Sequence, residues 1–252
     1  MIPATVIAIS TLAAVLIVLG FSRITLPRKP GFEGIEDPEA AQAYDRVSRW
    51  PQFRMLRRMF VGKLAKYQPS GTLADVGCGP GYLTTLIAQR FRHLHVVGFD
   101  TSSEMIRAAT LNTSSLGLSD RVAFREGDVS SLPIPEGTLD FAVSTLSLHH
   151  WSDPSQGLAE FHRVLKPGGQ LLIFDIRRDS RRFFYWLLRF VQRFVVPSAL
   201  QRVNEPLGSL LSSYTLAEVE SLFARSPFNE WKIEGGPAWV YAWVRKGPPE
   251  PV

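Results

Sequence analysis

The feature that most constrains the fold is a short apolar strand that runs into a glycine-rich turn and then into a helical segment. It occupies residues 73–88, LADVGCGPGYLTTLIA. Gly77, Gly79 and Gly81 stand at alternate positions and lack a Cβ, so the backbone of this turn can approach a ligand closely. A dinucleotide fingerprint, G-x-G-x-x-G, would need glycine where the chain has Tyr82. The spacing therefore disfavours a nicotinamide-dependent oxidoreductase.

Strand-like and helix-like segments alternate along the rest of the chain. The strand-like runs are 72–76, 94–99, 121–125, 139–146 and 170–175, and helix-like runs lie at 81–91, 102–116 and 155–165. This alternation predicts an α/β fold with a doubly wound parallel sheet. Near the end, two strand-like runs within 229–245 flank Gly235-Gly236-Pro237 and predict a hairpin. Ligands of such sheets bind at the carboxyl ends of the strands.

Acidic residues stand at the ends of the first three predicted strands. Asp75 belongs to the first, Asp100 closes the second, and Asp128 follows the third in Gly127-Asp128-Val129. A carboxylate at position 100 can accept hydrogen bonds from ribose hydroxyls, and one at position 128 from the exocyclic amine of adenine. Taken alone, Asp100 could cap a helix and Asp128 could shape a turn. In this order, beside the glycine turn, the three indicate one nucleoside site.

Two later segments complete a family pattern. They are the strand with its sequel at 139–151, LDFAVSTLSLHHW, and the element RVLKPGG at 163–169. With the glycine turn and the acidic positions, they resemble the class I S-adenosylmethionine-dependent methyltransferases, in particular the methyltransferase type 11 or ubiquinone-menaquinone-biosynthesis-like group. The resemblance covers about residues 40–176. It implies a seven-stranded Rossmann-like sheet with an antiparallel last strand, S-adenosylmethionine as cofactor and no metal.

The resemblance also implies which residues bind the cofactor. The glycine turn would hold its methionine part, and the acidic residues its ribose and adenine, with a backbone N–H from position 129. The end of the fourth strand would face the methionine carboxylate and the sulfonium. A tyrosine on the amino-terminal helix would cover the cofactor or simply pack. The implied residues are Tyr44, Asp75, Gly77, Gly79, Gly81, Asp100, Asp128, Val129, Ser144 and Thr145.

Residues that act on the acceptor are harder to assign. Methyl transfer depends mainly on positioning, and a base is needed only when the acceptor must lose a proton. His149 and His150 are weak candidates for that base, with packing of the loop as the favoured alternative. The single cysteine, Cys78, is interpreted as a small residue in a tight turn and not as a nucleophile.

The amino-terminal segment is apolar. Residues 2–21 carry no charge, and a helix of that length covers about 30 Å, the thickness of a bilayer core. Arg23, Arg28 and Lys29 follow, and nothing basic precedes. The segment predicts a single-pass transmembrane anchor over 1–22 with the catalytic domain on the cytoplasmic side. A cleaved signal peptide and a buried core helix are the alternatives.

A second apolar segment with basic residues lies at 181–196. Arg182, Arg189 and Arg193 share one helical stripe and apolar groups fill the remainder. It is interpreted as a lid at a membrane surface, with a buried helix as the alternative. The expected organisation is the anchor at 1–22, a linker at 23–36, the methyltransferase domain at 37–246 with a substrate lid at 177–228, and a disordered tail at 247–252.

The function predicted from the sequence is methyl transfer to a small, lipophilic acceptor at a membrane surface. Quinone precursors, sterol-like lipids, phospholipid headgroups and hydrophobic thiols or phenols all remain open as acceptors. The alternative is a catalytically silent cofactor-binding scaffold at a membrane. The net charge of +5 comes without any nucleic-acid-binding signature, so no nucleic-acid partner is expected.

Overall fold

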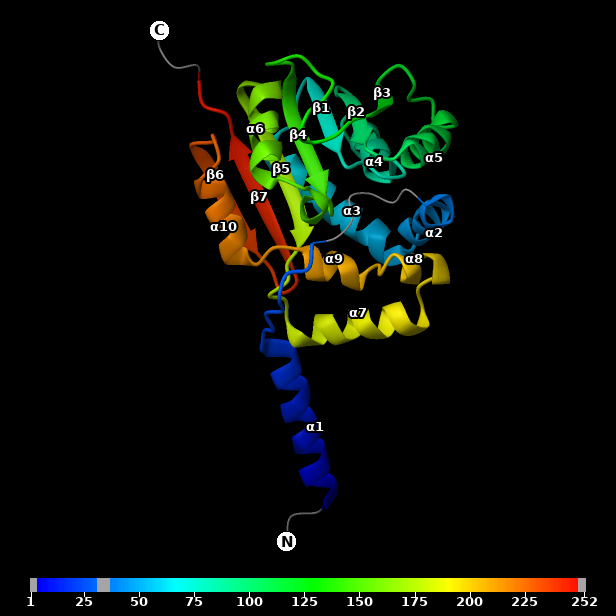
Figure 1. Cartoon of the computed structure of the whole chain (residues 1–252), viewed down its shortest axis with the longest axis vertical. Coiled ribbons are helices and arrows are strands. Elements are labelled where there is room, and N and C mark those ends of the chain that lie inside the picture. Colours follow the sequence, from blue (N-terminus) through cyan, green and yellow to red (C-terminus); the bar gives the residue numbers. More distant parts are fainter. Residues whose placement is uncertain (1–3, 31–36, 249–252) are drawn as a thin grey trace.

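A computed structural model describes residues 4–30 and 37–248, and seven strands in it form one sheet in the order β3-β2-β1-β4-β5-β7-β6 (Figure 1). The strands β1 to β5 run parallel, and β7 is antiparallel to both of its neighbours. This confirms the predicted Rossmann-like sheet with its antiparallel last strand. The strands are β1 Thr72–Val76, β2 His95–Asp100, β3 Val122–Glu126, β4 Leu139–Thr145, β5 Leu165–Ile176, β6 Glu230–Gly235 and β7 Trp239–Arg245.

Helices precede and connect the strands of this sheet. They are α1 Ala4–Phe21, α2 Pro38–Ser48, α3 Pro51–Leu64, α4 Tyr82–Arg90, α5 Ser103–Ser114, α6 Pro154–Val164, α7 Arg182–Phe194, α8 Ser198–Arg202, α9 Leu207–Ser212 and α10 Leu216–Ala224, with short 3₁₀ turns η1 Ala65–Tyr67 and η2 Leu148–His150. The helix α2 begins at Pro38, because Asp37 accepts hydrogen bonds from the backbone N–H groups of Glu39 and Ala40 and proline is favoured at the first helical position.

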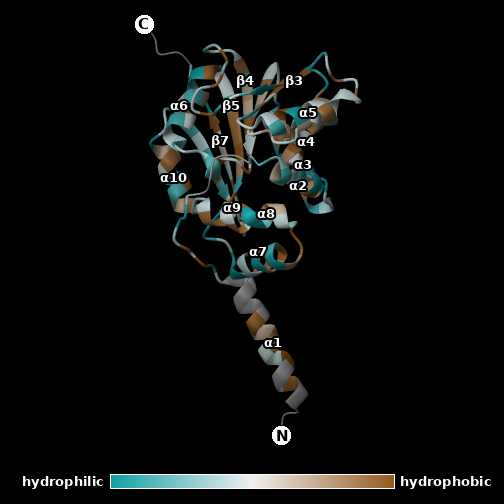
Figure 2. Ribbon diagram, turned by 45° about the vertical axis from the view of Figure 1, so that its right-hand side comes forward, coloured by the Kyte–Doolittle hydropathy of each residue, from teal (hydrophilic) through white to brown (hydrophobic). Residues whose placement is uncertain are grey.

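The apolar core is divided by the sheet. On one face α6 and α10 pack against the strands through residues such as Phe161 and Phe223, both fully buried. On the other face α3 and α4 do so through residues such as Phe60 and Ile87. The strands accordingly run through the hydrophobic centre of the domain (Figure 2). Burying both faces of the sheet is what the apolar strands in the sequence require.

The fifth strand begins earlier than the sequence indicated. It starts at Leu165 and not at residue 170, and the Lys-Pro-Gly-Gly segment forms an irregularity in its pairing with β4. On β4 the paired positions move from Leu139 to Phe141, while on β5 they move from Leu165 to Gln170. Extra residues on one strand of a pair produce a bulge, which here precedes the regular part of β5.

The amino-terminal helix α1 extends away from the sheet, and α7 lies across the domain between them (Figure 1). Among the described residues, none of the helices combines the length and the apolar character that crossing a membrane requires. The prediction of a transmembrane anchor over 1–22 is therefore not supported.

The segment after α1 is docked on the domain. The backbone N–H of Ile24 donates to the carbonyl of Ser180 at 3.1 Å, and that of Lys29 donates to the carbonyl of Leu211 at 2.9 Å. The Arg28 side chain lies 4.1 Å from the centre of the Tyr214 ring. The predicted linker is thus an extended strip along the lid region. Residues 31–36 of that linker, and 249–252 of the tail expected to be disordered, lie outside the described residues.

Candidate functional site

The glycine turn between β1 and α4 adopts the backbone that only glycine favours. The φ angles of Gly77, Gly79 and Gly81 are 76°, 52° and 77°. The backbone N–H groups of Gly77 and Cys78 donate to the carbonyl of Phe99 at 2.8 and 2.9 Å, which fixes the turn against β2. The turn therefore closes the carboxyl ends of β1 and β2 together.

The glycines differ in what surrounds them. A Cβ added at Gly79 would have only an ordinary contact, at 3.7 Å, with the ring of Tyr44. A Cβ at Gly81 would lie 2.8 Å from Ala109 and 2.9 Å from Phe124. Gly79 therefore faces the cavity described below, as Gly77 does, whereas Gly81 serves the close packing of α4 against α5 and β3.

Asp100, at the end of β2, faces the glycine turn. Its Oδ2 accepts the backbone N–H of Gly79 at 2.8 Å, and its Oδ1 accepts that of Ser102 at 3.0 Å. Burial raises the pKa of Asp100, and these backbone donors act in the opposite direction. Each carboxylate oxygen has a second lone pair, so both can also accept hydrogen bonds from a ligand.

Asp75 lies under the turn. The residue is fully buried, and its Oδ2 accepts the hydroxyl of Thr84 at 2.6 Å. Burial raises the pKa of Asp75 to about 7. It is not among the residues that line the cavity, so the structure places it beneath the glycine turn and not within reach of a ligand in the cavity.

Of the residues predicted to contact the adenine and the sulfonium, some line the cavity and one does not. Asp128 and Val129 line the cavity, and Asp128 Oδ1 also accepts the backbone N–H and the hydroxyl of Ser130, at 2.7 and 2.6 Å. Asp128 therefore shapes its turn as well as facing the site. Ser144 in β4 is fully buried and does not line the cavity, whereas Thr145, the next residue, does.

A polar cluster holds α2 over the glycine turn and so places Tyr44. The Tyr82 hydroxyl donates to Asp45 Oδ1 at 2.8 Å and accepts from Arg49 Nε at 2.5 Å. Asn112 Nδ2 donates to Asp45 Oδ1 at 3.0 Å and to the carbonyl of Pro80, within the turn, at 3.1 Å. The residue that replaces the third glycine of a dinucleotide fingerprint thus anchors the covering helix.

Tyr44 lines the cavity, as predicted for a residue that covers a ligand. Burial, together with the carboxylates of Glu205 and Asp100, raises its pKa to about 12. The tyrosine is therefore a neutral hydroxyl at physiological pH, able to donate or accept a hydrogen bond.

The cavity has a volume of about 870 Å³ and two chemically distinct parts. The part at the strand ends is polar and contains the glycine turn, Asp100, Asp128 and both histidines. The other part is a wall of apolar and aromatic side chains from α3, α7, β5 and β7. Its members include Phe53, Leu56, Phe174, Phe184, Leu188, Val191, Trp239 and Tyr241.

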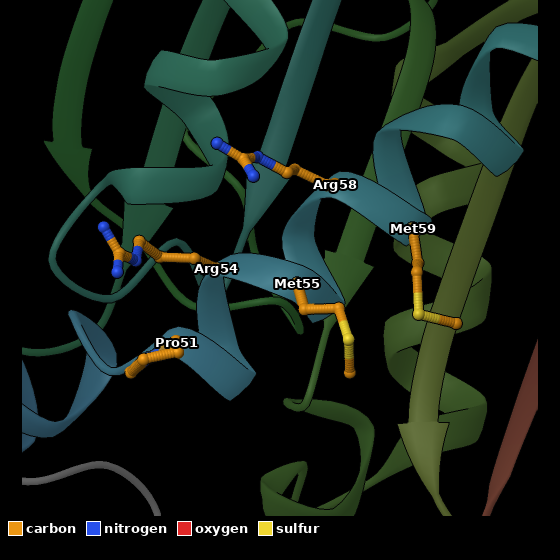
Figure 3. A pocket seen from close by; sticks show the side chains of 5 residues that line it. All are labelled: Pro51, Arg54, Met55, Arg58 and Met59. Carbon is orange, nitrogen blue, oxygen red and sulfur yellow. The ribbon is translucent and has the colours of Figure 1, made fainter.

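A second, smaller pocket of about 490 Å³ lies on the outer side of α3 (Figure 3). The side chains of Met55 and Met59 point to one side of the helix, and those of Arg54 and Arg58 point away from them (Figure 3). Both methionines also line the large cavity. Since methionine side chains are flexible and adapt to different shapes, these two form an adjustable rim of the cavity.

A buried histidine and a buried aspartate meet at the edge of the cavity. His149 Nδ1 lies 2.8 and 2.9 Å from the two carboxylate oxygens of Asp175, which ends the buried part of β5. His149 is 3% exposed and Asp175 1% exposed. His150 lies beside His149, with ring centres 4.1 Å apart. Both histidines predicted from the sequence line the cavity.

Sequence reasoning missed Asp175 and Glu205. Asp175 could have been found, because it ends a predicted strand at the same sheet edge as Asp100. Glu205 lies between α8 and α9 and lines the cavity from the lid region, which no motif covers. Burial raises the pKa of Glu205.

Part of the sequence is similar to known proteins. Residues 74–173 match the family described as "Methyltransferase domain". The demethylmenaquinone methyltransferase of Symbiobacterium thermophilum is 28% identical over 205 residues, which are 76% of this chain and 81% of that protein. A 37.1 kDa transposon protein of Streptomyces fradiae is 38% identical over 149 residues. That match covers 59% of this chain, and the chain spans only 42% of that protein.

The architecture also has solved counterparts. The crystal structure of a SAM-dependent methyltransferase from Aquifex aeolicus superposes with a TM-score of 0.62 at 22% identity. The match covers 83% of this chain and 98% of the other. At this identity the likeness establishes the fold alone, because one fold can serve many activities.

Proposed function

We propose that this chain, a methyltransferase that uses S-adenosylmethionine, transfers the methyl group to a small lipophilic acceptor held in the apolar part of the cavity. The observation that carries this proposal is that one cavity joins the glycine turn and Asp100 to an aromatic and aliphatic wall. Donor and acceptor can therefore meet inside a single enclosure. The relative from Symbiobacterium thermophilum is named for an acceptor of this lipophilic class, demethylmenaquinone.

The residues of the polar part fit S-adenosylmethionine. Asp100 lines the cavity and offers carboxylate oxygens to a ribose, and the open space beside Gly79 leaves the turn accessible to the methionine part. Asp128 and Val129 lie where the adenine would be held. When bound, the cofactor supplies a methyl group on a positively charged sulfur. The protein then has to orient the acceptor and exclude water from the cavity.

We infer that α7 brings the acceptor from a lipid surface. Its inner side chains Phe184, Leu188 and Val191 line the cavity. On its outer side large apolar groups are exposed, among them Trp186 at 53% and Phe194 at 68%. One helix thus has an apolar face toward the cavity and another toward solvent.

The charges on α7 favour an anionic bilayer as the partner of this outer face. Arg182, Arg189 and Arg193 are exposed beside the apolar groups, and Arg189 lies over the Trp186 ring at 5.3 Å. Basic residues beside an exposed apolar face are typical of helices that lie in the headgroup region. The orientation toward the cytoplasm stays a prediction from the sequence.

Two measurements test the enzymatic proposal. Calorimetry with S-adenosylhomocysteine should show binding, and no binding would refute the cofactor assignment. Labelled S-adenosylmethionine with a lipid-extract panel should then yield methylated, organic-soluble products. Binding without transfer to any member of the panel would favour the silent scaffold.

Co-sedimentation of the full chain with vesicles tests the surface proposal. We expect binding to vesicles of phosphatidylcholine with phosphatidylglycerol, weakened by salt and by the double substitution Trp186→Ala and Phe190→Ala. The matched control is Leu111→Ala, which removes an exposed apolar side chain from α5 and should not change vesicle binding. Equal vesicle binding by the double variant would refute the role of α7.

A further inference from the structure

We propose that His149, held by Asp175, takes a proton from the acceptor, and that the acceptor therefore carries a weakly acidic X–H group on an apolar body. The inference rests on the proposed methyl transfer and names the class of acceptor for the same site. It assigns to Asp175 a positioning role that no motif in the sequence indicated.

The tautomer of His149 follows from its partners. Asp175 Oδ2 accepts the backbone N–H of His149 at 3.0 Å, and Oδ1 accepts that of Ile176 at 2.7 Å. Both carboxylate oxygens also lie within 2.9 Å of His149 Nδ1. Since an ionised carboxylate only accepts hydrogen bonds, Nδ1 carries the proton in the neutral ring. The lone pair is then on Nε2, the nitrogen that a general base uses.

Nε2 of His149 is buried and has no hydrogen-bond partner within the described part of the chain, and the residue lines the cavity. A buried polar atom without a partner is uncommon in a folded protein and calls for an explanation. Ser144 Oγ has no partner within 4–30 and 37–248 either, but Ser144 does not line the cavity. At His149 an acceptor with an acidic X–H group would supply the missing donor.

The charged groups around His149 come from three elements. Burial lowers its pKa, and Asp175 on β5 raises it by its charge and its hydrogen bond. Glu205 between α8 and α9 raises it further, Arg28 in the docked segment lowers it, and His150 is adjacent in η2. The pKa of His149 lies above its ordinary value as a result. Nε2 is then protonated at low pH and becomes a base as the pH rises.

The step balances without another reactant. The proton of the acceptor X–H group goes to His149 Nε2, and the electron pair it leaves on X forms the bond to the methyl carbon. The bond between that carbon and sulfur breaks, and its pair stays on sulfur. A neutral acceptor and a sulfonium thus give a methylated acceptor, a neutral thioether and an imidazolium, which releases its proton to solvent.

The proton transfer is tested first without turnover. The probe is 4-nitrophenol, whose phenolate is yellow, added to the full chain with S-adenosylhomocysteine. We expect a larger phenolate fraction for the bound probe than for the free probe at the same pH. His149→Asn keeps a donor for Asp175 but lacks Nε2, so its bound probe should stay neutral. The control His162→Asn removes a histidine on α6 whose ring packs on Phe228, and should behave as wild type.

The acceptor class is tested on the wild type, which needs no variant to fold. The panel is 2-naphthol, 2-naphthalenethiol and 2-naphthalenemethanol, which share one apolar body and differ in acidity. We expect methylation of the naphthol, the thiol or both, which identifies X, and no methylation of the non-acidic alcohol. With the accepted compound, His149→Asn should lower kcat/KM by about 10²–10⁴-fold, and the wild-type rise of kcat/KM with pH should be lost.

Asp175→Asn should lower kcat with little change in KM, because it disturbs the tautomer and not the apolar wall. Equal methylation of the alcohol, or a wild-type pH profile in a His149→Asn variant that binds S-adenosylhomocysteine, would overturn the inference while leaving methyl transfer intact. Failure of the wild type to bind S-adenosylhomocysteine would instead refute the proposed function itself.

Discussion

Replacing Asp75 with asparagine should stabilise the protein, and by an amount that depends on pH. Asp75 is fully buried, and its pKa of about 7 in the folded chain compares with an ordinary value of 3.8. A raised pKa means that folding favours the protonated carboxyl. The stability that the protonated Asp75 carboxyl contributes to the folded state is fully present below about pH 4 and is lost as the pH rises toward 7.

The size of the effect follows from the pKa difference. Each pKa unit corresponds to about 1.4 kcal/mol, so the difference between 3.8 and about 7 is worth about 4 kcal/mol. Asparagine imitates the protonated carboxyl, because its oxygen can still accept the Thr84 hydroxyl that now bonds Asp75 Oδ2 at 2.6 Å. The gain in the free energy of unfolding should be near zero below pH 4 and should level off near 4 kcal/mol above pH 7.

Urea unfolding of the wild type and the variant at intervals between pH 4 and 8 measures this gain. The matched control is Asp120→Asn, on an exposed loop, where a surface substitution should change stability by less than about 0.5 kcal/mol. S-adenosylhomocysteine affinity should be retained by Asp75→Asn, since that side chain does not line the cavity. A gain that is constant with pH, or a loss of stability at pH 8, would refute the reasoning.

The cofactor site and the covering elements allow three further predictions. Asp100→Ala should weaken S-adenosylhomocysteine binding at least tenfold by calorimetry, because a hydrogen bond to a charged group contributes about 1.5–3 kcal/mol; unchanged affinity would contradict the ribose assignment. Tyr82→Phe removes the hydroxyl that joins Asp45 and Arg49. Amide hydrogen exchange in α2 should therefore accelerate and the affinity for the cofactor should fall several-fold, while the melting temperature of the domain should change little. Deleting residues 1–22 should leave a folded domain that binds S-adenosylhomocysteine with native affinity, and loss of folding would show that α1 belongs to the core.

The sheet and the residues that line the cavity at its edge were predictable because local patterns determine them. Glycine spacing set the turn, and the acidic ends of strands identified Asp100 and Asp128 before any contact was known. The same patterns could not distinguish a side chain that faces the cavity from one beneath it. Asp75, Gly81 and Ser144 were predicted at the site from their motif positions, and the structure buries them in packing.

Contacts between distant segments were the part that sequence could not predict. The pairing of His149 with Asp175 joins residues 26 positions apart, and only the neighbouring of β4 and β5 brings them together. The tie between Tyr82 and Asp45 depends likewise on how α2 crosses α4.

The docked segment after α1 determines how freely the folded domain can turn. A flexible linker over 23–36 would let the domain wander about 20 Å from the end of α1, because such a chain spreads with the square root of its length. Here contacts begin at the end of α1, where the Gly20 carbonyl accepts from the Arg181 guanidinium at 2.6 Å. They continue at Arg23, whose guanidinium donates to the carbonyl of Asp179 at 2.9 Å. The connection between α1 and the folded domain is therefore short and held in place. If α1 binds a surface, α7 and the cavity have one fixed orientation relative to that surface. The conformational entropy that a tethered domain would lose on being oriented is then not lost.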